Sequence, residues 1–389
     1  MDTTPAPCNC TAVILPPAAM SFHPVAGLPL IQRVALSALR AGFDSVVALA
    51  PFEAARLRAV FARDARTAAI PVVADARDSL IATDRVALVP SDCVLTTGAL
   101  QRVRSAHLNG RPVAFGSAGD GIVVGPRASL TASGGCVAFE GAAERGALAG
   151  ELCVRVSDPA SAAAAERALL ATLGSPSDGP IARFDRALST RISRYLVRTP
   201  LRPNHITTIG TCTGFAGAWA LAQGTYLSGV LGTLLFWVAV IIDGCDGEVA
   251  RLKFQESRLG YLYDITTDNL VHAAIFFGIG AGLYRADPTQ PFLALGALLV
   301  GGLICATAAT MTLLVPESPA GQAPARTARG RWRQRLLRGF EALMNRDFAY
   351  PLFGLALLGR LDWFLWGAAF GTYVYAAALV LVYRWREAD

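Results

Sequence analysis

The chain has 389 residues, of which 53% are hydrophobic and only 16% are charged, and its formal net charge is +6. An apolar share this high excludes a disordered protein and an ordinary soluble one. Arginine supplies nearly all of the positive charge, which in a membrane protein marks the cytoplasmic flanks of its spans, so nucleic acid is not expected as a partner. Because the apolar residues are unevenly spread, the sequence predicts a soluble first half and a membrane-embedded second half.

The soluble first half is predicted to be cytosolic, which bears on the state of its cysteines. The eight cysteines show no CxxC spacing, and in the cytosol they are predicted to be reduced thiols. Residues 1–10 lack a basic start followed by an apolar core, so no signal peptide is expected.

The first half alternates short apolar runs with helical stretches. This alternation is typical of an α/β, Rossmann-like domain with a parallel sheet and crossover helices, here predicted over residues 1–175. A further helix is predicted at 162–173 with Ser161 as its N-cap. The other predicted elements are strands at 12–15, 45–50, 69–75 and 86–90, and helices at 30–42 and 52–64.

Two segments of this half carry a family resemblance. GLPLIQR at 27–33 and VALVPSDCVL at 86–95 are similar to the segment after the nucleotide loop, and to the strand that ends in a metal-binding aspartate, in alcohol-phosphate and sugar-phosphate cytidylyltransferases. That aspartate is Asp92 here. A triphosphate loop needs flexible backbone amides and a cation, whereas residues 16–27 hold no Lys or Arg and no Gly before Gly27. We therefore predict an inactive nucleotidyltransferase-like domain.

Residues 176–202 are predicted to form a linker and an amphipathic juxtamembrane helix. Within them, residues 181–199 place apolar side chains on one face and arginines over much of the rest. Such a helix beside a span usually lies in the headgroup plane, and packing against the soluble domain is the alternative.

From residue 203 to 389 the sequence predicts an all-α membrane domain of six transmembrane helices. Arginine is concentrated in the stretches 247–258 and 317–346, whereas the alternate loops are short and nearly uncharged. This asymmetry places both termini and the loop 247–258 in the cytoplasm, in what we expect to be a bacterial inner membrane. A second interfacial helix is predicted at 328–345. The predicted spans are 206–224, 226–243, 259–284, 291–315, 349–360 and 363–383, most of them near the length needed to cross.

Four aspartates stand in two pairs at the adjoining ends of the second and third predicted spans. Asp243 and Asp246 are three residues apart, and Asp264 and Asp268 are four apart, so each pair shares one helix face. If the helices pack together, the carboxylates converge, and they stay ionised only with positive charge between them. Hard divalent cations prefer oxygen ligands, so the sequence predicts two Mg²⁺ or Mn²⁺ ions. A structural ion-pair cluster is the alternative, but it needs more cations than the neighbouring sequence supplies.

The full spacing, D-x2-D-G-x2-A-R-x8-G-x3-D-x3-D from Asp243 to Asp268, resembles the signature of the CDP-alcohol phosphotransferase (CDP-alcohol phosphatidyltransferase) family. The resemblance covers about residues 181–389. It implies Asp268 as the general base and Asp243, Asp246 and Asp264 as metal ligands. The residues alone do not separate these roles, so Asp268 also counts among the predicted ligands.

The resemblance and the residue types together predict the substrate sites. Glycine lets a nucleotide approach the backbone closely, and arginine can hold a phosphate through paired N–H groups. The predicted CDP-alcohol residues are Gly247, Ala250, Arg251, Gly260, Asn204 and Thr207, and the predicted acceptor residues are Arg258, Arg198 and Arg202. Asn204 and Thr207 belong to the segment PNHIT at 203–207, which is similar to the family's segment at the start of the first span. Helix capping is the alternative role for Asn204.

The sequence thus predicts an integral-membrane transferase of phospholipid biosynthesis, working as a homodimer among membrane lipids. It moves a phosphatidyl or other phosphoalcohol group from a CDP-alcohol, expected to be CDP-diacylglycerol, to an alcohol acceptor and releases CMP. The acceptor stays open between inositol phosphate, glycerol phosphate and an amino alcohol. One alternative is a bifunctional cytidylyltransferase and transferase that makes an inositol phosphodiester from CDP-inositol. A transporter would spread its acids over several spans, and a binding protein with a dead transferase would carry a broken motif.

Overall fold

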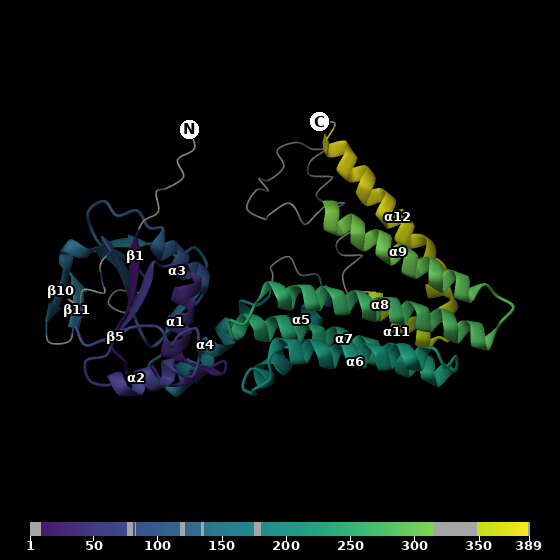
Figure 1. Ribbon diagram of the computed structural model, residues 1–389, viewed down its shortest axis with the longest axis horizontal. Helices are drawn as coiled ribbons and strands as arrows, with labels where there is room; N and C mark the ends of the chain where they lie inside the picture. Colours follow the sequence, from purple (N-terminus) through teal and green to yellow (C-terminus); the bar gives the residue numbers. More distant parts are fainter. Residues whose placement is uncertain are drawn as a thin grey trace. The chain divides into compact units, whose positions relative to one another are not determined.

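The computed structural model describes residues 9–75, 81, 83–116, 121–133, 136–174, 180–313 and 348–387. The chain forms two compact units, one of Met1–Ser175 with Val197–Thr199 and one of Pro176–Leu196 with Pro200–Asp389. In Figure 1 the first unit is a sheet with helices around it and the second consists of helices. An α/β unit followed by a helical unit is therefore confirmed.

Seven strands of the first unit form one mixed sheet in the order β12-β8-β9-β6-β1-β4-β5. The neighbours β5, β4, β1 and β6 run parallel, as the alternation of strands and helices predicts. β9 pairs antiparallel with both β6 and β8, an arrangement that the sequence pattern did not predict. The strands are β1 (Cys10–Ile14), β4 (Ser45–Leu49), β5 (Val72–Val73), β6 (Arg85–Val89), β8 (Val113–Phe115), β9 (Ile122–Pro126) and β12 (Glu144–Gly146).

Short strand pairs and four helices complete the described part of this unit. The pairs are β2 (Pro24–Val25) with β3 (Leu28–Pro29), β7 (Cys93–Leu95) with β13 (Cys153–Arg155), and β10 (Leu130–Ser133) with β11 (Cys136–Phe139); a 3-10 turn, η1, covers Arg127–Ser129. The helices are α1 (Leu30–Arg40), α2 (Ala54–Phe61), α3 (Thr97–Arg104) and α4 (Pro159–Ala171).

The prediction of Ser161 as the N-cap of α4 was wrong. Asp158 is the N-cap, and its carboxylate accepts hydrogen bonds from the amides of Ala160 and Ser161, both at 2.8 Å. The Ser161 hydroxyl accepts in turn from the Asp158 amide at 3.0 Å. This reciprocal pair is a capping box, in which the third helical residue also caps.

In the second unit, helix α6 packs against two neighbouring helices. It lies against both α7 and α8, while α9 packs against α8 and α12, and α5 and α11 pack against α7 (Figure 1). Each predicted span falls on one helix, and the predicted interfacial helix at 328–345 lies outside the described residues. The helices are α5 (Pro180–Leu196), α6 (Pro203–Leu221), α7 (Tyr226–Leu252), α8 (Arg258–Ala286), α9 (Phe292–Leu313), α11 (Ala349–Leu357) and α12 (Leu361–Glu387).

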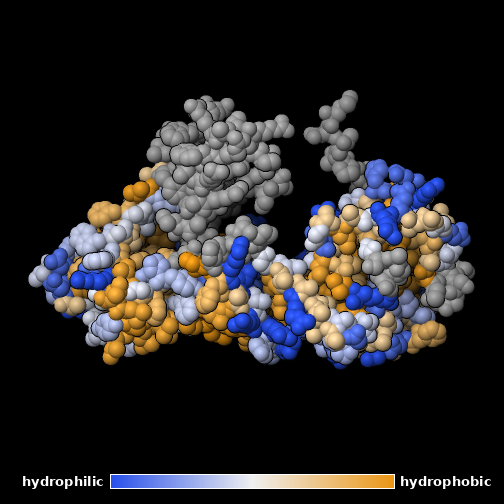
Figure 2. All heavy atoms as spheres, turned by 180° about the vertical axis from the view of Figure 1, so that it is seen from behind, coloured by the Kyte–Doolittle hydropathy of each residue, from blue (hydrophilic) through white to orange (hydrophobic). Residues whose placement is uncertain are grey.

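Within the described residues, α7 is the helix long and apolar enough to cross a membrane, and Phe292–Ala308 forms a shorter apolar helix. Large apolar side chains also lie on the outside of this unit. Trp219 is 71% exposed and Leu227 is 78% exposed, and Figure 2 shows hydrophobic side chains gathered over the surface of these helices. An apolar surface of this kind favours contact with lipid or with another protein.

Glycines set the spacing between α6 and its neighbours. A Cβ atom on Gly232 would lie 2.7 Å from the carbonyl oxygen of Gly217 on α6, and one on Gly282 of α8 would lie 2.1 Å from the carbonyl oxygen of Leu221. Both distances are shorter than any real contact, so the helices reach this spacing only because the side chains are missing.

The edge of the sheet where a triphosphate would bind is closed by contacts of the chain itself. The segment 16–27 follows β1 and is joined to the residues after β6, since Ser91 donates to the carbonyl oxygen of Pro16 at 2.8 Å. Arg33 is buried beneath the segment and donates to the carbonyl oxygens of Val25 and Ala26, and its burial lowers its pKa to about 10. Asp92 is bound by Arg155 at 3.0 Å. The charged groups near this edge therefore already have partners.

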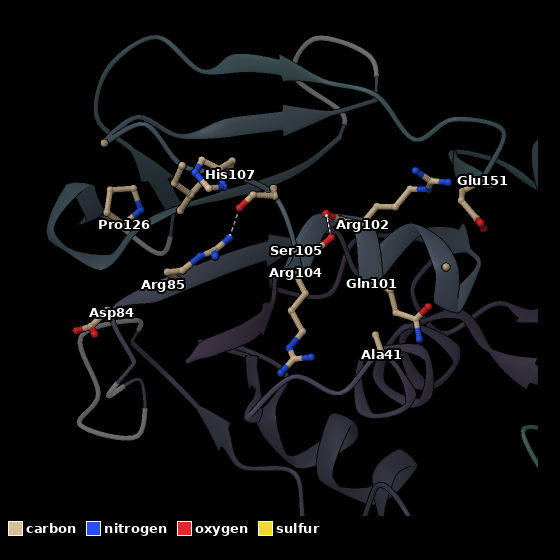
Figure 3. Close-up of a pocket in the computed structure, with 14 residues that line it drawn as sticks. Ala41, Asp84, Arg85, Gln101, Arg102, Arg104, Ser105, His107, Pro126 and Glu151 are labelled. Atoms are coloured by element: carbon tan, nitrogen blue, oxygen red, sulfur yellow. Dashed lines mark hydrogen bonds between the residues drawn. The ribbon is translucent and has the colours of Figure 1, made fainter. Parts of the chain in front are cut away.

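A cavity of about 1080 Å³ lies at the other edge of the sheet, where β6 begins. Figure 3 shows Arg85 in this cavity, where its Nη2 donates to the carbonyl oxygen of Ala106 at 2.6 Å. Arg104 also lines it and points toward the segment that holds Ala41, while Asp84 and Glu151 add negative charge. Arg85 thus binds a residue just after α3, and Arg104 lies 4.0 Å from Asp44, just after α1.

We predict opposite stability changes for the same substitution at two helical glycines. Gly232→Ala should destabilise the helical unit by about 1–3 kcal/mol, because the new methyl group would collide with α6. Gly367→Ala on α12 should stabilise it by up to about 1 kcal/mol, since no atom of the described residues lies within 4 Å of that position and alanine favours the helix. Thermal unfolding in detergent, followed by circular dichroism, measures both. Equal shifts would contradict the tight contact.

We predict that the first unit does not make a CDP-alcohol. The full-length Asp268→Asn variant, incubated with Mg²⁺, CTP and inositol phosphate or glycerol phosphate, should release no pyrophosphate above the level without enzyme, because Asp92 and Arg33 are already bound within the chain. A coupled pyrophosphate assay measures the release. Robust production of pyrophosphate would overturn the prediction of an inactive domain.

Candidate active site

The four aspartates lie on two helices that both pack against α6. Asp243 and Asp246 lie in the last turns of α7, and Asp264 and Asp268 lie in the first turns of α8. The short connection between them begins with Phe254, whose φ of 56° ends α7 sharply. Ser257 then caps α8 by accepting the amide of Gly260 at 3.0 Å. A tight turn followed by a capped helix places the two acidic pairs at the same end of the unit.

Three of the four carboxylates meet. Asp243, Asp246 and Asp264 each offer an oxygen atom, and these atoms lie within 4.8 Å of one another. Asp246 is 4% exposed and accepts a hydrogen bond from the Thr207 hydroxyl of α6. The Oδ1 atom of Asp264 is buried, with no hydrogen-bond partner in the part of the chain that the structure describes. Carboxylates this close cannot all ionise unless a cation joins them.

These three residues line a cavity of about 350 Å³, which we call the aspartate pocket. Its described walls carry five carboxylates but only two guanidinium groups, those of Arg186 and Arg251. An all-oxygen donor set with excess negative charge and a buried unpartnered oxygen fits Mg²⁺ or Mn²⁺. The remaining lining residues are Ala182, Asp185, Ser189, Val240, Ile241, Gly244, Gly247 and Glu248.

Asp268 stands apart from the other three. Its side chain is 44% exposed, and its Oδ1 lies 3.4 Å from Nδ1 of His272, one turn further along α8. It lines a separate cavity of about 20 Å³ that also contacts Asp243 and Thr207. The sequence predicts four converging carboxylates, and the structure brings three together with the fourth beside them. A general base needs such a position, close to the metal ligands but open to a substrate.

The predicted CDP-alcohol residues fall in different positions around the cluster. Gly247 and Arg251 line the aspartate pocket, and a Cβ on Gly247 would lie 3.5 Å from Nη1 of Arg251. The Thr207 hydroxyl donates a hydrogen bond to the carboxylate of Asp246. Asn204 lies beside Gly260, where an added Cβ would be 3.4 Å from Oδ1 of the asparagine. Ala250 is not among the described lining residues; its carbonyl oxygen accepts the amide of Gln255 at 2.8 Å.

None of the three predicted acceptor arginines is among the described residues that line the aspartate pocket. Arg198 belongs to the first unit, where Nη2 binds Oε1 of Glu166 at 3.0 Å. Arg202 is the exposed N-cap residue of α6, and Arg258 is the exposed first residue of α8. Their role with an acceptor stays a prediction.

Sequence reasoning missed the contribution of α5 to this pocket. Asp185, Arg186 and Ser189 line it together with the aspartates. The amphipathic pattern of residues 181–199 indicated which face of the helix is polar, but no residue spacing indicates what that face contacts.

We predict that the Thr207 hydroxyl supports metal binding. Thr207→Val should weaken Mn²⁺ binding about tenfold to a hundredfold, because Asp246 loses the group that orients its carboxylate, whereas Thr207→Ser should keep most of the affinity. Titration of Mn²⁺ followed by electron paramagnetic resonance measures both. Thr213→Val is the matched control, since that hydroxyl donates to the carbonyl oxygen of Ile209 within α6. Equal affinities for all variants would exclude the role.

Comparison with known proteins shows which family the site resembles. Residues 201–331 match the family model described as CDP-alcohol phosphatidyltransferase. The bifunctional IPC transferase and DIPP synthase of Rubrobacter xylanophilus is 37% identical over 178 residues, which are 45% of this chain and 38% of that protein. The protein of the same name from Archaeoglobus fulgidus is 35% identical over 154 residues, 39% of this chain and 30% of its own length.

A third relative is the phosphatidylinositol phosphate synthase of Mycobacterium tuberculosis, which is 34% identical over 92 residues, 24% of this chain and 42% of that protein. The chain therefore spans less than half the length of each of these relatives. The family match contains the whole motif from Asp243 to Asp268, including the three carboxylates that meet in the structure. Over residues 201–331, the chain is therefore similar to the CDP-alcohol phosphatidyltransferase family.

Proposed function

We propose that the protein is a metal-dependent membrane transferase that moves a phosphoalcohol group from a CDP-alcohol to an alcohol acceptor and releases CMP. The observation that carries this proposal is the meeting of Asp243, Asp246 and Asp264 within 4.8 Å inside the residues that match the family. Asp268 stands one turn away on α8, outside this group. A metal-binding triad beside a separate carboxylate provides both electrostatic stabilisation and a base.

The residues of the site suit transfer to a hydroxyl group. Divalent ions held by the three aspartates would neutralise their charge and polarise the pyrophosphate of the donor. The carboxylate of Asp268 accepts the proton of the acceptor hydroxyl, the oxygen attacks the β-phosphorus, and the bond to CMP breaks. Arg251 binds phosphate oxygens through its paired N–H groups, and Gly247 leaves room for that guanidinium. Asp268 is also retained as a proposed metal ligand during turnover.

For the substrates, we propose CDP-diacylglycerol as the donor and inositol phosphate as the acceptor. A lipid donor accounts for a transfer site at the end of an apolar helix. Phosphatidylinositol phosphate synthase is the name of one relative, and its product contains both groups. The second candidate is transfer from soluble CDP-inositol, which the α/β unit and the bifunctional relatives favour; the contacts of Asp92 and Arg33 argue against synthesis of that donor by this chain.

We also propose that the helical unit is embedded in a bacterial inner membrane through six spans, as a homodimer, with both termini and the site in the cytoplasm. The apolar length of α7 and the exposed apolar side chains over α6 and α7 support the membrane. The arginine-rich stretches at 247–258 and 317–346 support the orientation, because cytoplasmic loops carry an excess of basic residues.

We predict that purified protein with Mg²⁺, CDP-diacylglycerol and inositol phosphate releases CMP, and that Asp268→Asn slows release about a hundredfold or more, because an amide cannot accept the proton. Measurement of CMP by chromatography, with CDP-inositol as a parallel donor and several acceptors, tests both proposals. Asp362→Asn, an acidic substitution in the first turn of α12, is the control and should leave the rate unchanged. Full turnover by Asp268→Asn would remove that residue from the mechanism.

A further inference from the structure

α5 forms one wall of the aspartate pocket although it lies outside the residues that match the family. The helix spans Pro180–Leu196 and the family match begins at residue 201. Its residues Asp185, Arg186 and Ser189 line the pocket together with the three clustered aspartates. A substrate that reaches the metal ligands through this pocket therefore also contacts α5.

Arg186 is one of two guanidinium groups among the described residues that line the pocket, and the other, Arg251, belongs to the family motif. The neighbouring acid on α5, Asp185, is held by the hydroxyl of Tyr350 on α11. The Arg186 side chain is 33% exposed, so it is neither sealed in the interior nor fully in water. A planar guanidinium in that position suits two-point binding of a phosphate group.

Glu248 fixes the place of this arginine. The glutamate is 1% exposed, and its Oε1 accepts hydrogen bonds from Ser189 at 2.6 Å and from Thr190 at 3.3 Å. Nη1 of Arg186 lies 4.0 Å from the same oxygen. These contacts tie α5 to α7 at the residue after Gly247. The distance of 4.0 Å is long for a charged hydrogen bond, so Glu248 acts on the guanidinium mainly through its negative charge.

The second oxygen of Glu248 is also informative. Oε2 is buried and has no hydrogen-bond partner within the described residues. A buried carboxylate is costly unless it is paired, and removal of its partner is strongly destabilising. Glu248 occupies a position that the motif leaves variable, so the motif does not explain this cost. Placement of Arg186 beside the pocket explains it.

We propose that Arg186 binds a phosphate group of a substrate in the transfer site and that Glu248 is its positioning residue. This inference rests on the proposed function, which it deepens by adding a phosphate-binding residue from α5. The phosphate group belongs either to the pyrophosphate of the donor or to the phosphate ester of the acceptor, and both present the same anionic oxygens to the guanidinium.

The first experiment measures KM for CDP-diacylglycerol and for inositol phosphate separately, with full-length protein in lipid nanodiscs. Arg186→Gln should raise one of these KM values about tenfold to a hundredfold, as expected when a charged hydrogen bond is lost, and the substrate whose KM rises identifies the source of the phosphate. Arg186→Lys should recover part of the affinity. Arg191→Gln, an exposed arginine of the same helix that is not among the lining residues, should change neither value.

The second experiment separates substrate binding from a structural ion pair. Glu248→Gln keeps an acceptor for Ser189 but removes the charge, and it should raise the same KM about threefold to tenfold in the wild-type background. In the Arg186→Gln background it should have no further effect, because it acts through the arginine. If Arg186 and Glu248 form only a structural ion pair, the double variant should instead recover, because removal of both charges would restore KM and thermal stability. That recovery, or equal behaviour of Arg186→Gln and Arg191→Gln, would overturn the proposal.

A binding measurement distinguishes failure of this inference from failure of the proposed function. Isothermal titration of inorganic pyrophosphate, with Mn²⁺ present, reports phosphate binding in the pocket even if no substrate pair is turned over. Arg186→Gln should weaken this binding about tenfold, while Arg191→Gln should match the wild type. Unchanged pyrophosphate affinity together with unchanged KM values would refute the role of Arg186, whatever the reaction of the protein.

Discussion

Repulsion between three carboxylates within 4.8 Å of one another is the constraint on which the helical unit depends. Acids at the end of an apolar helix are already costly, and their mutual repulsion adds to that cost. Two features of the fold offset this electrostatic cost. Thr207 of α6 donates a hydrogen bond to Asp246, and the oxygen-rich pocket can accept divalent cations. Helix packing must hold the acids together before a cation binds. That requirement explains why α6 contacts both acidic helices so closely.

Close contacts at glycines hold the two acidic helices against α6. Gly232 of α7 and Gly278 of α8 face α6, where an added Cβ would lie 2.7 Å and 2.5 Å from backbone carbonyl oxygens. These contacts lie toward the opposite ends of α7 and α8 from the aspartates, so they fix the helix axes over most of their length. With both helices fixed against α6, the acidic ends have little freedom to separate. Packing of small residues thus maintains an arrangement that electrostatics alone would disperse.

The sequence predicted the parts of this site that depend on local spacing. Pairs three and four residues apart share a helix face, so the aspartates could be placed on two helices from their positions alone. The separation of Asp268 from the other three depends on the helix rotation, and the approach of Arg186 depends on tertiary packing, so neither could be predicted. The same limit holds in the sheet. Alternation with helices predicted the parallel strands, but the antiparallel direction of β9 is set by its partners.

Buried acids have different hydrogen-bond and ion-pair partners in the two units, and this contrast bears on the proposed site of transfer. In the α/β unit, Asp92 is 5% exposed and is bound by Arg155 at 3.0 Å, so a protein cation already balances its charge. In the helical unit, Asp246 is equally buried but is held by a neutral hydroxyl, and Oδ1 of Asp264 has no partner within the described residues. A carboxylate paired with arginine must give up that partner before it can bind a metal ion. One held by a hydroxyl keeps its charge available, which supports the aspartates of α7 and α8 as the proposed site of the transfer.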